Sequence, residues 1–485
     1  MDHESNGAMR PDIAAEICVL GGGPAGAVVA RRLAELGHDT LLIDRTAGAK
    51  PPRAESLAPS ILPILESLHL RDDIEAAVFR RERQALLLWG SRFIHEKTFA
   101  DAPSLLIERT GFDTLLRRAA TRAGVRLMAP ARARAPQHLA SGGWAVPVAT
   151  PAGASVIKAA FLVDARGKRA HGCDDSTPRT AAMSALWSTP DQFFAQTRIE
   201  AGFDAWFWGS PSPGSCYAAT IFLESQRIAG ASTANRAETY RHLLAQSKLL
   251  NGLLRGEMIG PVRVRDATSR ISPDLIGNDF IRVGEAAIAI DPLSSQGIQD
   301  AILSAIQASA AVHTILTAGC APAAAMEFYR DRRHSAAANS RMAAARFYRA
   351  HPEQSSFWIR RSSGPGRPVS SPLPVRAAGT VPSELRASRA LQIVDIPVLS
   401  GAFIERARAL SHPRLEQPIA YFAGVALAPL IDEASGVAAT EQILSRWTQR
   451  MPIKTARNIL DWMWAVGILE PRAGACEDHA TSARR

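Results

Sequence analysis

The sequence predicts an α/β protein in which a parallel-sheet domain is interrupted by a mixed β-sheet and followed by a mainly helical C-terminal domain. Three observations support this. A strand-turn-helix-strand unit occupies residues 17–43, a glycine-rich turn and a long Ala-rich helix follow residue 284, and a Ser/Gly/Pro-rich stretch lies at 362–382. Because the two glycine-rich turns stand on either side of a strand-rich middle, we expect them to belong to one discontinuous domain.

The bulk composition is that of an ordinary globular protein. The chain has 485 residues, of which 47% are hydrophobic and 21% charged, and this length favours more than one domain. No apolar run approaches membrane-spanning length and the first ten residues are polar, so we expect a cytoplasmic protein that does not bind membranes. The five cysteines are scattered without C-x-x-C spacing, which argues against a disulfide framework and against a metal site.

The positive net charge does not by itself indicate a nucleic-acid-binding protein. The formal charge is +10, but the lysines are few and the arginines are spread along the whole chain. Nucleic-acid-binding proteins gather their cations on one stripe or tail. We therefore expect no nucleic acid partner, although an acidic protein or peptide would be attracted to this surface.

The strand-turn-helix-strand unit has the pattern of a Rossmann-type dinucleotide-binding fold. Its turn, Gly21-Gly22-Gly23-Pro24-Ala25-Gly26, joins an apolar strand to an apolar helix, and the second strand ends at Asp44. Gly21 allows the sharp turn, Gly23 lets backbone amides approach a pyrophosphate, and Gly26 lets the helix pack close to the strand. Asp44 stands about 20 residues further on, where an acid binds a ribose hydroxyl.

The remaining patterns give the domain boundaries. We expect a disordered N-terminus at 1–13, a large domain at 14–350, a linker at 351–382 and a helical, winged-helix-like domain at 383–485. The large domain would comprise cofactor-binding parts at about 14–75, 105–178 and 278–350, and a substrate-binding sheet at about 76–104 and 179–277. For the last domain, a helical appendage packed on the protein is an equally good interpretation, and exposed aromatic residues there would favour contact with a polypeptide.

Four motifs, in this order along the chain, resemble the FAD-dependent aromatic monooxygenases and the related flavin-dependent tryptophan halogenases. They are the 21–26 turn with Asp44, the helix that begins Arg109-x-x-Phe112-Asp113, the strand and turn Leu162-Val163-Asp164-Ala165-Arg166-Gly167, and the turn Gly284-Glu285-Ala286-Ala287 with Asp291-Pro292 and Gly297. The resemblance covers residues 14 to about 350. It implies an aromatic hydroxylase-like fold with FAD as cofactor and O2 as co-substrate.

The resemblance also implies which residues bind FAD. The turn residues would hold the pyrophosphate, Asp44 the adenosine ribose, and Arg109 the ribityl-phosphate side. Glu285 takes the place of the aspartate that usually binds the ribityl hydroxyls, and helix N-terminal amides near Ile298 favour negative charge on reduced flavin. The full set of expected cofactor-binding residues is Gly21, Gly23, Pro24, Ala25, Gly26, Asp44, Arg45, Arg53, Arg109, Glu285, Asp291, Pro292, Gly297 and Ile298.

Two features bear on the reaction. The halogenases hold a catalytic lysine after the segment that corresponds to residues 53–57, but this sequence has no lysine between Lys50 and Lys97. The stretch Trp206-Phe207-Trp208-Gly209-Ser210-Pro211 resembles the halogenase pattern Trp-x-Trp-x-Ile-Pro with serine in place of isoleucine, and related hydroxylases have similar strands. The missing lysine therefore favours hydroxylation over halogenation.

The turn at 291–297 and the extra C-terminal domain are similar to flavoprotein monooxygenases of tryptophylquinone biogenesis, the kind that serves quinohemoprotein amine dehydrogenase. The resemblance implies hydroxylation of tryptophan in a protein or peptide through a flavin C4a-hydroperoxide. NAD(P)H or a partner flavin reductase would supply electrons. Hydroxylation or halogenation of a small aromatic or indole metabolite stays open as the alternative, as does a flavin-carrying regulator that reads DNA.

An apolar chamber beside the flavin must hold the substrate ring and exclude water. Trp89, Trp206, Trp208 and Phe222 are the expected lining residues, although such residues more often belong simply to the hydrophobic core. A general acid or base near the flavin would be His, Glu or Tyr. The catalytic candidates are Glu55, His95 and Tyr217.

Overall fold

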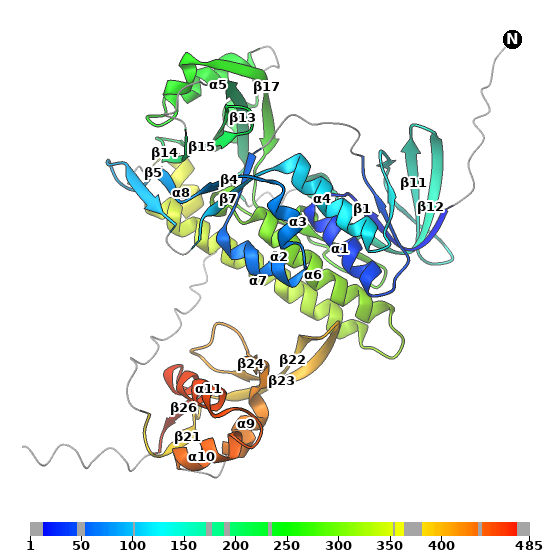
Figure 1. Cartoon of the computed structure of the whole chain (residues 1–485), viewed down its shortest axis with the longest axis vertical. Coiled ribbons are helices and arrows are strands. Elements are labelled where there is room, and N and C mark those ends of the chain that lie inside the picture. Colours follow the sequence, from blue (N-terminus) through cyan, green and yellow to red (C-terminus); the bar gives the residue numbers. More distant parts are fainter. Residues whose placement is uncertain are drawn as a thin grey trace, which may run out of the picture. The chain divides into compact units, whose positions relative to one another are not determined.

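The computed structural model describes residues 13–45, 54–99, 102–170, 177–188, 195–230, 235–352, 355–362, 381–434 and 439–472 (Figure 1). The chain divides into two compact units, one of residues 1–322 with 329–365 and the other of residues 323–328 with 366–485. Within the described ranges, no helix is long and apolar enough to cross a membrane.

The first sheet is built around strand β1 (Ile13–Leu20) and is mainly parallel. β1 pairs with β2 (Thr40–Ile43) and with β12 (Gly153–Asp164), β2 pairs with β8 (Arg126–Met128), and β12 pairs with β19 (Phe280–Arg282). An antiparallel extension adds β11 (Trp144–Thr150), β10 (Gln137–His138) and β9 (Arg132–Ala133). In this register Leu20 lies opposite both Ile43 and Asp164, so the parallel strands end at one common edge. Open α/β sheets bind their ligands at this edge.

Three helices pack together on this sheet. Helix α1 (Pro24–Glu35) contacts both α4 (Arg109–Arg122) and α6 (Gly297–Leu316) (Figure 1). The apolar side chains Val28, Val29 and Leu33 of α1 are buried, as their helical spacing predicts. The N-terminal end of α1 therefore lies at the edge where the strands end.

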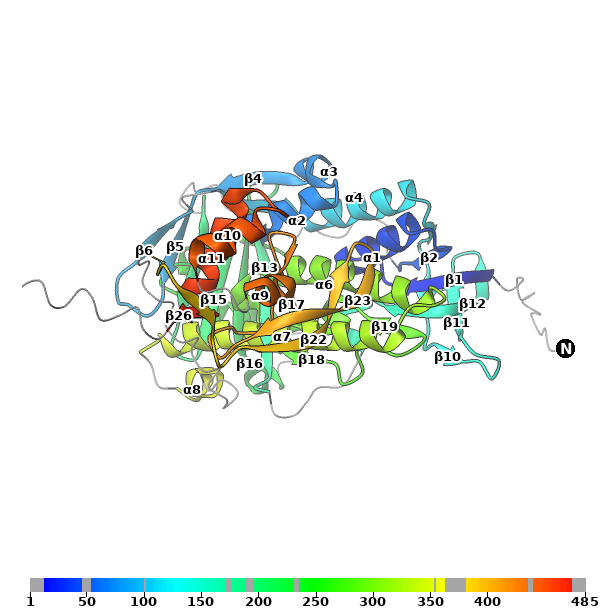
Figure 2. The same ribbon diagram turned by 90° about the horizontal axis from the view of Figure 1, so that it is seen from below.

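The second sheet is mixed and has seven strands. Its order is β17 (Glu257–Asp266), β13 (Thr180–Ser188), β16 (Cys216–Glu224), β15 (Ala205–Ser212), β14 (Thr197–Ala201), β5 (Gln84–Leu88) and β6 (His95–Thr98). Only β14 and β5 pair in parallel. The strands come from the two segments in which the sequence predicted a substrate sheet, and Figure 2 shows the two sheets at opposite ends of the first unit.

The two faces of the second sheet bury different side chains. One face packs against helix α5 (Arg236–Leu244) and carries Phe207, Tyr217 and Ile221. The other face carries Trp206 and Phe222, which belong to a separate aromatic cluster. This separation follows from the alternation of side chains along β15 and β16.

Shorter elements complete the first unit. A three-stranded sheet is formed by β3 (Ala54–Leu57), β7 (Ser104–Glu108) and β4 (Val78–Glu82), near the short helices α2 (Leu62–Ser67) and α3 (Arg71–Glu75). Strands β18 (Arg270–Ile271) and β20 (Ile288–Ala289) pair beside the second glycine-rich turn. The long helix α7 (Pro322–Arg349) runs from the end of α6 toward the second sheet.

The predicted linker at 351–382 is partly structured. Residues 356–362 form helix α8 (Ser356–Ser362), in which Phe357 and Trp358 are each 2% exposed. The Arg361 guanidinium donates to Glu224 (3.0 Å) and to Thr180 Oγ1 (2.8 Å) of the second sheet. This helix therefore belongs to the first unit, and residues 363–380 lie outside the described residues. Only seven residues form α8, which is too short for the sequence to show a helical period.

The second unit contains helices and a short strand after Gly467, as the sequence pattern indicates, together with further strands that the pattern did not predict. Its elements are β21 (Leu385–Ala387), β22 (Gln392–Ser400), β23 (Phe403–Ser411), β24 (Tyr421–Phe422), β25 (Val425–Ala426), α9 (Leu427–Ala434), α10 (Thr440–Trp447), α11 (Ile453–Ala465) and β26 (Leu469–Pro471). β22 and β23 form a hairpin whose turn begins with Gly401 at φ +58°, a conformation that tight hairpins require. Trp462 and Trp464 are half-buried against the core of this unit, so they are not the fully exposed aromatics that would grip a polypeptide.

The α8 anchor gives a test of the domain boundary. Arg361 is buried and its guanidinium also lies over the Phe357 ring, 3.9 Å from the centroid. Arg361→Met should lower the unfolding free energy of the first unit by about 3 kcal/mol, because Glu224 and Thr180 lose a buried charged donor. Arg360→Met is the matched control, since Arg360 is half exposed and its ion pair with Glu224 is longer, at 3.4 Å. Urea denaturation followed by tryptophan fluorescence measures the unfolding free energy of both variants. Equal losses would contradict the assignment of α8 to the first unit.

Candidate functional site

The turn after β1 packs so closely that two of its positions have no room for a side chain. Gly21 has φ +103°, and a Cβ there would lie 2.6 Å from the Ala165 carbonyl oxygen. A Cβ at Gly26 would lie 1.8 Å from the Gly21 carbonyl oxygen. At Gly23, in contrast, an added Cβ would meet no atom within 4 Å. The turn is thus tight on the protein side and open at the N-terminus of α1, which is where a phosphate binds.

Asp44 lies next to this turn and is linked to it by an arginine. Asp44 follows β2 and is 6% exposed. Its carboxylate forms an ion pair with Arg117, with Oδ2 3.3 Å from Nη1. Arg117 Nη1 also donates to the Gly22 carbonyl oxygen (3.1 Å). Arg45, the next residue, is exposed, and Arg53 lies outside the described residues.

An open cavity lies along α4, and Arg117, one of its lining residues, pairs with Asp44. Its volume is about 580 Å³, and its lining comprises Thr114, Arg117, Arg118, Thr121, Arg122 and Leu127. Ligand pockets in proteins have volumes of this order. Arg117 therefore joins this cavity to the Asp44 carboxylate and to the turn after β1.

The other two motifs meet the first at the edge of the sheet. Arg166 binds both carboxylate oxygens of Asp164 (2.9 and 2.7 Å), which keeps the turn after β12 closed. The Asp164 carbonyl oxygen accepts a hydrogen bond from Val283 N (3.0 Å). Gly284 has φ +58°, and a Cβ there would lie 2.7 Å from Ala25 Cβ. The second glycine-rich turn therefore packs directly on the start of α1.

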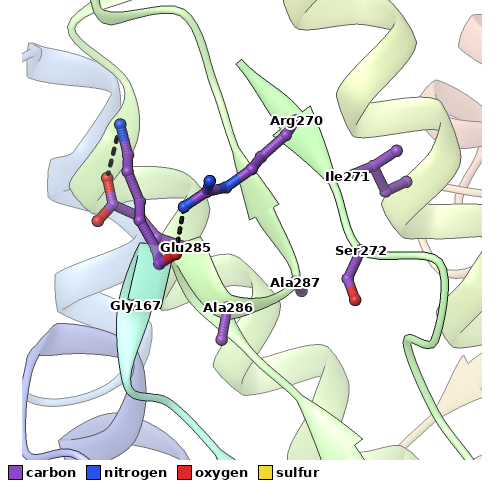
Figure 3. Close-up of a pocket in the computed structure, with 8 residues that line it drawn as sticks. Gly167, Arg270, Ile271, Ser272, Glu285, Ala286 and Ala287 are labelled. Atoms are coloured by element: carbon purple, nitrogen blue, oxygen red, sulfur yellow. Dashed lines mark hydrogen bonds and ion pairs between the residues drawn. The ribbon is translucent and has the colours of Figure 1, made fainter. Parts of the chain in front are cut away.

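Glu285 points to the surface beside a small pocket. The pocket has room for about one water molecule and is lined by Gly167, Lys168, Arg270, Ile271, Ser272, Glu285, Ala286 and Ala287 (Figure 3). Lys168 Nζ lies 3.8 Å from Glu285 Oε1 and donates to the Asp266 carbonyl oxygen (3.1 Å). The glutamate that replaces the usual aspartate thus has a cation beside it.

Arg109 begins α4 and is held between two carboxylates. Its Nη1 donates to both oxygens of Glu55 (3.0 and 3.1 Å), and its Nε donates to Asp113 (2.7 Å). Burial by itself would lower the pKa of the Arg109 guanidinium, but Glu55 and Asp113 outweigh burial and raise the pKa above its usual value. Burial raises the pKa of Asp113 although Arg109 opposes the shift. This ion pair fixes the start of α4 relative to β3.

The Asp291 turn carries a half-buried carboxyl that is held by hydrogen bonds to both of its oxygens. Asp291 Oδ1 accepts from Leu293 N (3.0 Å), and Tyr348 OH bonds Oδ2 and Oδ1 at 2.9 and 3.1 Å. Burial raises the pKa of Asp291, and the bonds from Leu293 and Tyr348 oppose the shift. Burial, followed by the Asp291 charge, raises the pKa of Tyr348 well above its usual value. Tyr348 therefore stays a neutral donor to this turn.

The residues that follow this turn lie where a ring could approach. Pro292 is half-buried and Gly297, the first residue of α6, is exposed. A Cβ at Gly297 would meet no atom within 4 Å, whereas Ile298 is 8% exposed and packs inward. The start of α6 is therefore accessible and supplies unpaired backbone amides.

The four aromatic residues that the sequence singled out lie in one cluster. Trp89, Trp206, Trp208 and Phe222 pack together with Leu293, Tyr348, Phe357 and Trp358. The Trp206 and Phe222 rings stack at 3.8 Å, and Trp89 meets Trp206 edge-on at 6.2 Å. The stacked rings of Trp206 and Phe222 cover each other and both side chains are buried. Of the four residues, only the half-buried Trp89 and Trp208 therefore offer surface to a substrate. Tyr348 joins this cluster to the Asp291 turn.

The structure does not bring the three acid-base candidates together. Glu55 is engaged with Arg109, and His95 is exposed on the edge strand β6, opposite Leu87. Tyr217 lies on the α5 face of the second sheet, where its OH donates to the Gln196 carbonyl oxygen (2.9 Å) and burial raises its pKa. Because Tyr217 and the aromatic cluster occupy opposite faces, this position argues against a catalytic role for Tyr217.

The geometry fits the FAD that the motifs imply. An open helix N-terminus suits the pyrophosphate, the buried Asp44 suits a ribose, and the Asp291 turn with the start of α6 suits the ring system. Three residues of this arrangement, Arg117, Lys168 and Tyr348, carry no signal in the sequence. Only their contacts in the folded chain show their importance.

The tight turn predicts which glycine is indispensable for FAD. Gly26→Ala should yield a colourless protein, because the new methyl group would overlap the Gly21 carbonyl oxygen and displace α1. Gly111→Ala is the control: it lies within α4, and its Cβ would be 3.5 Å from the nearest atom, Glu108 Oε2, an ordinary contact. Visible absorbance of the purified proteins and titration with FAD measure the difference. A Gly26→Ala protein with normal FAD affinity would contradict the assignment.

The Tyr348 bond predicts a pH-dependent loss of stability. The folded pKa of Asp291 lies above its unfolded value of about 4, so stability associated with protonated Asp291 is present at low pH and is lost as the pH rises through the folded pKa. Tyr348→Phe removes a donor to the carboxylate and should cost about 1.5–3 kcal/mol at neutral pH and less in acid.

Tyr329→Phe provides the control on the same helix. Its OH donates to the Arg282 carbonyl oxygen (2.6 Å), which does not titrate, so its cost should not change with pH. Chemical denaturation across a pH series compares the two variants. If the stability loss of both variants had the same pH profile, the hydrogen bond from Tyr348 would not depend on the ionisation of Asp291, and the prediction would be wrong.

The comparisons with known proteins agree with this geometry. Residues 14–184 match the family described as FAD binding domain. The chain is 28% identical over 340 residues to tryptophan 2-halogenase of Chondromyces crocatus, covering 65% of this chain and 64% of that protein. It is also 28% identical over 312 residues to the putative FAD-dependent oxidoreductase LodB of Marinomonas mediterranea, covering 61% of this chain and 83% of that protein.

Two solved structures share the fold across 94% of this chain. The peptidyl tryptophan dihydroxylase QhpG, essential for tryptophylquinone cofactor biogenesis, has a TM-score of 0.73 at 24% identity, with 99% of its chain covered. The flavin-dependent halogenase CmlS has a TM-score of 0.73 at 19% identity, with 96% of its chain covered. The chain therefore contains an FAD-binding domain at residues 14–184, and its fold is the one shared by QhpG and CmlS.

Proposed function

We propose that this chain is an FAD-dependent monooxygenase that hydroxylates a tryptophan side chain of a protein or peptide during biogenesis of a quinone cofactor. The observation that carries the choice of oxygenation is the absence of any lysine between Lys50 and Lys97, where the related halogenases hold their catalytic lysine. Lys168, at the second glycine-rich turn, is already engaged with Glu285 and the Asp266 carbonyl oxygen.

The residues of the site have distinct parts in this reaction. Bound and reduced, FAD would use O2 to supply an electrophilic oxygen. Trp89 and Trp208 would hold the substrate ring by stacking and exclude water. Asp291, fixed by Tyr348, would hold the turn in place, and the amides at the start of α6 would favour negative charge on the cofactor.

The peptide substrate rests on two considerations. QhpG, a peptidyl tryptophan dihydroxylase, shares the fold over 94% of this chain. The net charge of +10 would also attract an acidic polypeptide. The electron source in this proposal is NAD(P)H or a partner flavin reductase.

A second candidate function is hydroxylation or halogenation of a small aromatic or indole metabolite. The 28% identity to tryptophan 2-halogenase over 340 residues favours it. In this alternative Trp89 and Trp208 would hold a free ring rather than a side chain.

One experiment separates these functions. The FAD-loaded protein is reduced, then exposed to O2, chloride and bromide with either a tryptophan-containing polypeptide or free tryptophan, with catalase present to remove free hydrogen peroxide. Mass spectrometry should show added oxygen atoms on the polypeptide tryptophan and no halogen. Exchange of hydrogen for halogen on the substrate, or preference for free tryptophan, would contradict the proposal. The control is the same protein with its FAD left oxidised, which should modify neither substrate.

A further inference from the structure

Large apolar side chains are exposed around Trp89 and Trp358. They are Phe93 (77% exposed), Phe203 (68%), Ile94 (56%), Phe347 (54%) and Ile359 (47%). These five residues, which we call the apolar rim, come from the β5–β6 loop, the turn before β15, the end of α7 and α8. Exposed apolar patches of this kind mark interaction sites.

Two indole rings hold these segments together. Trp89 Nε1 donates to the Phe347 carbonyl oxygen (2.9 Å), and Trp358 Nε1 donates to the Phe203 carbonyl oxygen (2.8 Å). The two rings meet edge-on, with centroids 5.5 Å apart, and Ile359 follows Trp358 directly. The rim residues from α7, α8 and the turn before β15 are therefore neighbours around one pair of rings.

The β5–β6 loop is built onto the same place. Gly90 has φ +67°, and a Cβ there would lie 2.8 Å from the carbonyl oxygen of Ala350, at the end of α7. Ser91 Oγ accepts a hydrogen bond from Phe93 N (2.9 Å), which shapes the loop tip. The base of this loop is thus packed against α7, while Phe93 and Ile94 project into solvent.

The exposed charges beside the rim are mainly positive. Arg92, Arg346, Arg349 and Arg360 are all exposed and stand within two residues of a rim residue in the sequence. Among the described residues, the nearby acids are Asp204, which pairs with Arg227 at 2.7 Å, Glu224, which pairs with Arg360 at 3.4 Å, and Glu96, which is followed by Lys97. The surface around the rim therefore complements a negatively charged partner.

We propose that the apolar rim and its four arginines form the docking surface for the polypeptide substrate, which carries apolar side chains among Asp and Glu residues. This inference rests on the proposed function, because docking here places the polypeptide next to Trp89 of the aromatic cluster. Aromatic side chains and arginine, both present here, are enriched at protein interfaces.

Binding to the full-length FAD-loaded protein tests the proposal. The probes are a fluorescein-labelled peptide with one tryptophan among Leu and Glu residues, and a matched peptide with Lys in place of Glu. The acidic peptide should bind more tightly than the basic one, and Phe93→Ser with Ile94→Ser should weaken it about tenfold or more. Ile259→Ser is the control, because Ile259 is 43% exposed on β17 at the opposite edge of the same sheet.

Several outcomes would overturn the docking surface. They are equal affinity for both peptides or no affinity for either, unchanged binding in the Phe93/Ile94 variant, and an equal loss in the Ile259→Ser control. Sedimentation that shows a dimer dissolved by the variant would assign the rim to a second copy of this chain. Binding to anionic vesicles that the variant abolishes, without peptide binding, would assign it to a membrane surface.

The same variants separate this proposal from the proposed function. If the Phe93/Ile94 variant adds oxygen to the peptide as efficiently as the unmodified protein, at peptide concentrations below saturation, the docking surface is wrong and the hydroxylation stands. If the variant loses peptide binding but the unmodified protein adds no oxygen, the docking surface stands and the hydroxylation is wrong. Activity on free tryptophan should not change in the variant, because no rim residue belongs to the aromatic cluster.

Discussion

The close approach of α1 to the turn after β1 is the constraint on which the rest of the structure depends. The Gly21 carbonyl oxygen occupies the space that a Cβ at Gly26 would need, and Ala165 closes the turn from the other side. The register that sets Leu20 opposite Ile43 and Asp164 brings all these segments to one edge. A helix N-terminus held there offers backbone amides without any charged side chain, so binding of phosphate follows from how the strands end.

A second constraint joins the cofactor side of the protein to the aromatic cluster. Asp291 and Tyr348 are far apart in the sequence, yet their hydrogen bond fixes the turn before α6 to the end of α7. Burying a carboxyl costs folding free energy, as the raised pKa of Asp291 shows. The hydroxyl of Tyr348 offsets part of this cost, and the Tyr348 ring packs among Trp206, Phe357 and Trp358. One residue therefore serves both the polar turn and the apolar cluster.

How much could be predicted from the sequence depended on whether the signal was local. Gly21, Gly26 and Asp44 could be identified from their spacing within one strand-turn-helix-strand unit. The four aromatic residues could be identified because they lie in stretches with a strand-like pattern. Arg117, Tyr348 and Arg361 act on partners between 57 and 181 residues away, so no local pattern marks them. Tyr217 is different: it lies five positions before Phe222 on one strand, and this odd spacing already places the two on opposite faces. Strand parity could have removed Tyr217 from the catalytic candidates before the structure was known.

The aromatic cluster and the apolar rim are parts of one hydrogen-bonded assembly. Trp89 and Trp358 pack their rings into the cluster. The indole N–H of Trp89 donates to the backbone of the exposed Phe347, and that of Trp358 donates to the backbone of the exposed Phe203. Because a buried N–H must find an acceptor, neither ring can shift without moving the rim segment that it binds. A partner that presses on the rim would therefore act on Trp89, and through the Trp89–Trp206 contact on the rings nearest the Asp291 turn. The same two indoles pack in the aromatic cluster and fix the backbone of the rim, so a chain docked on the rim would be coupled to the geometry of the site.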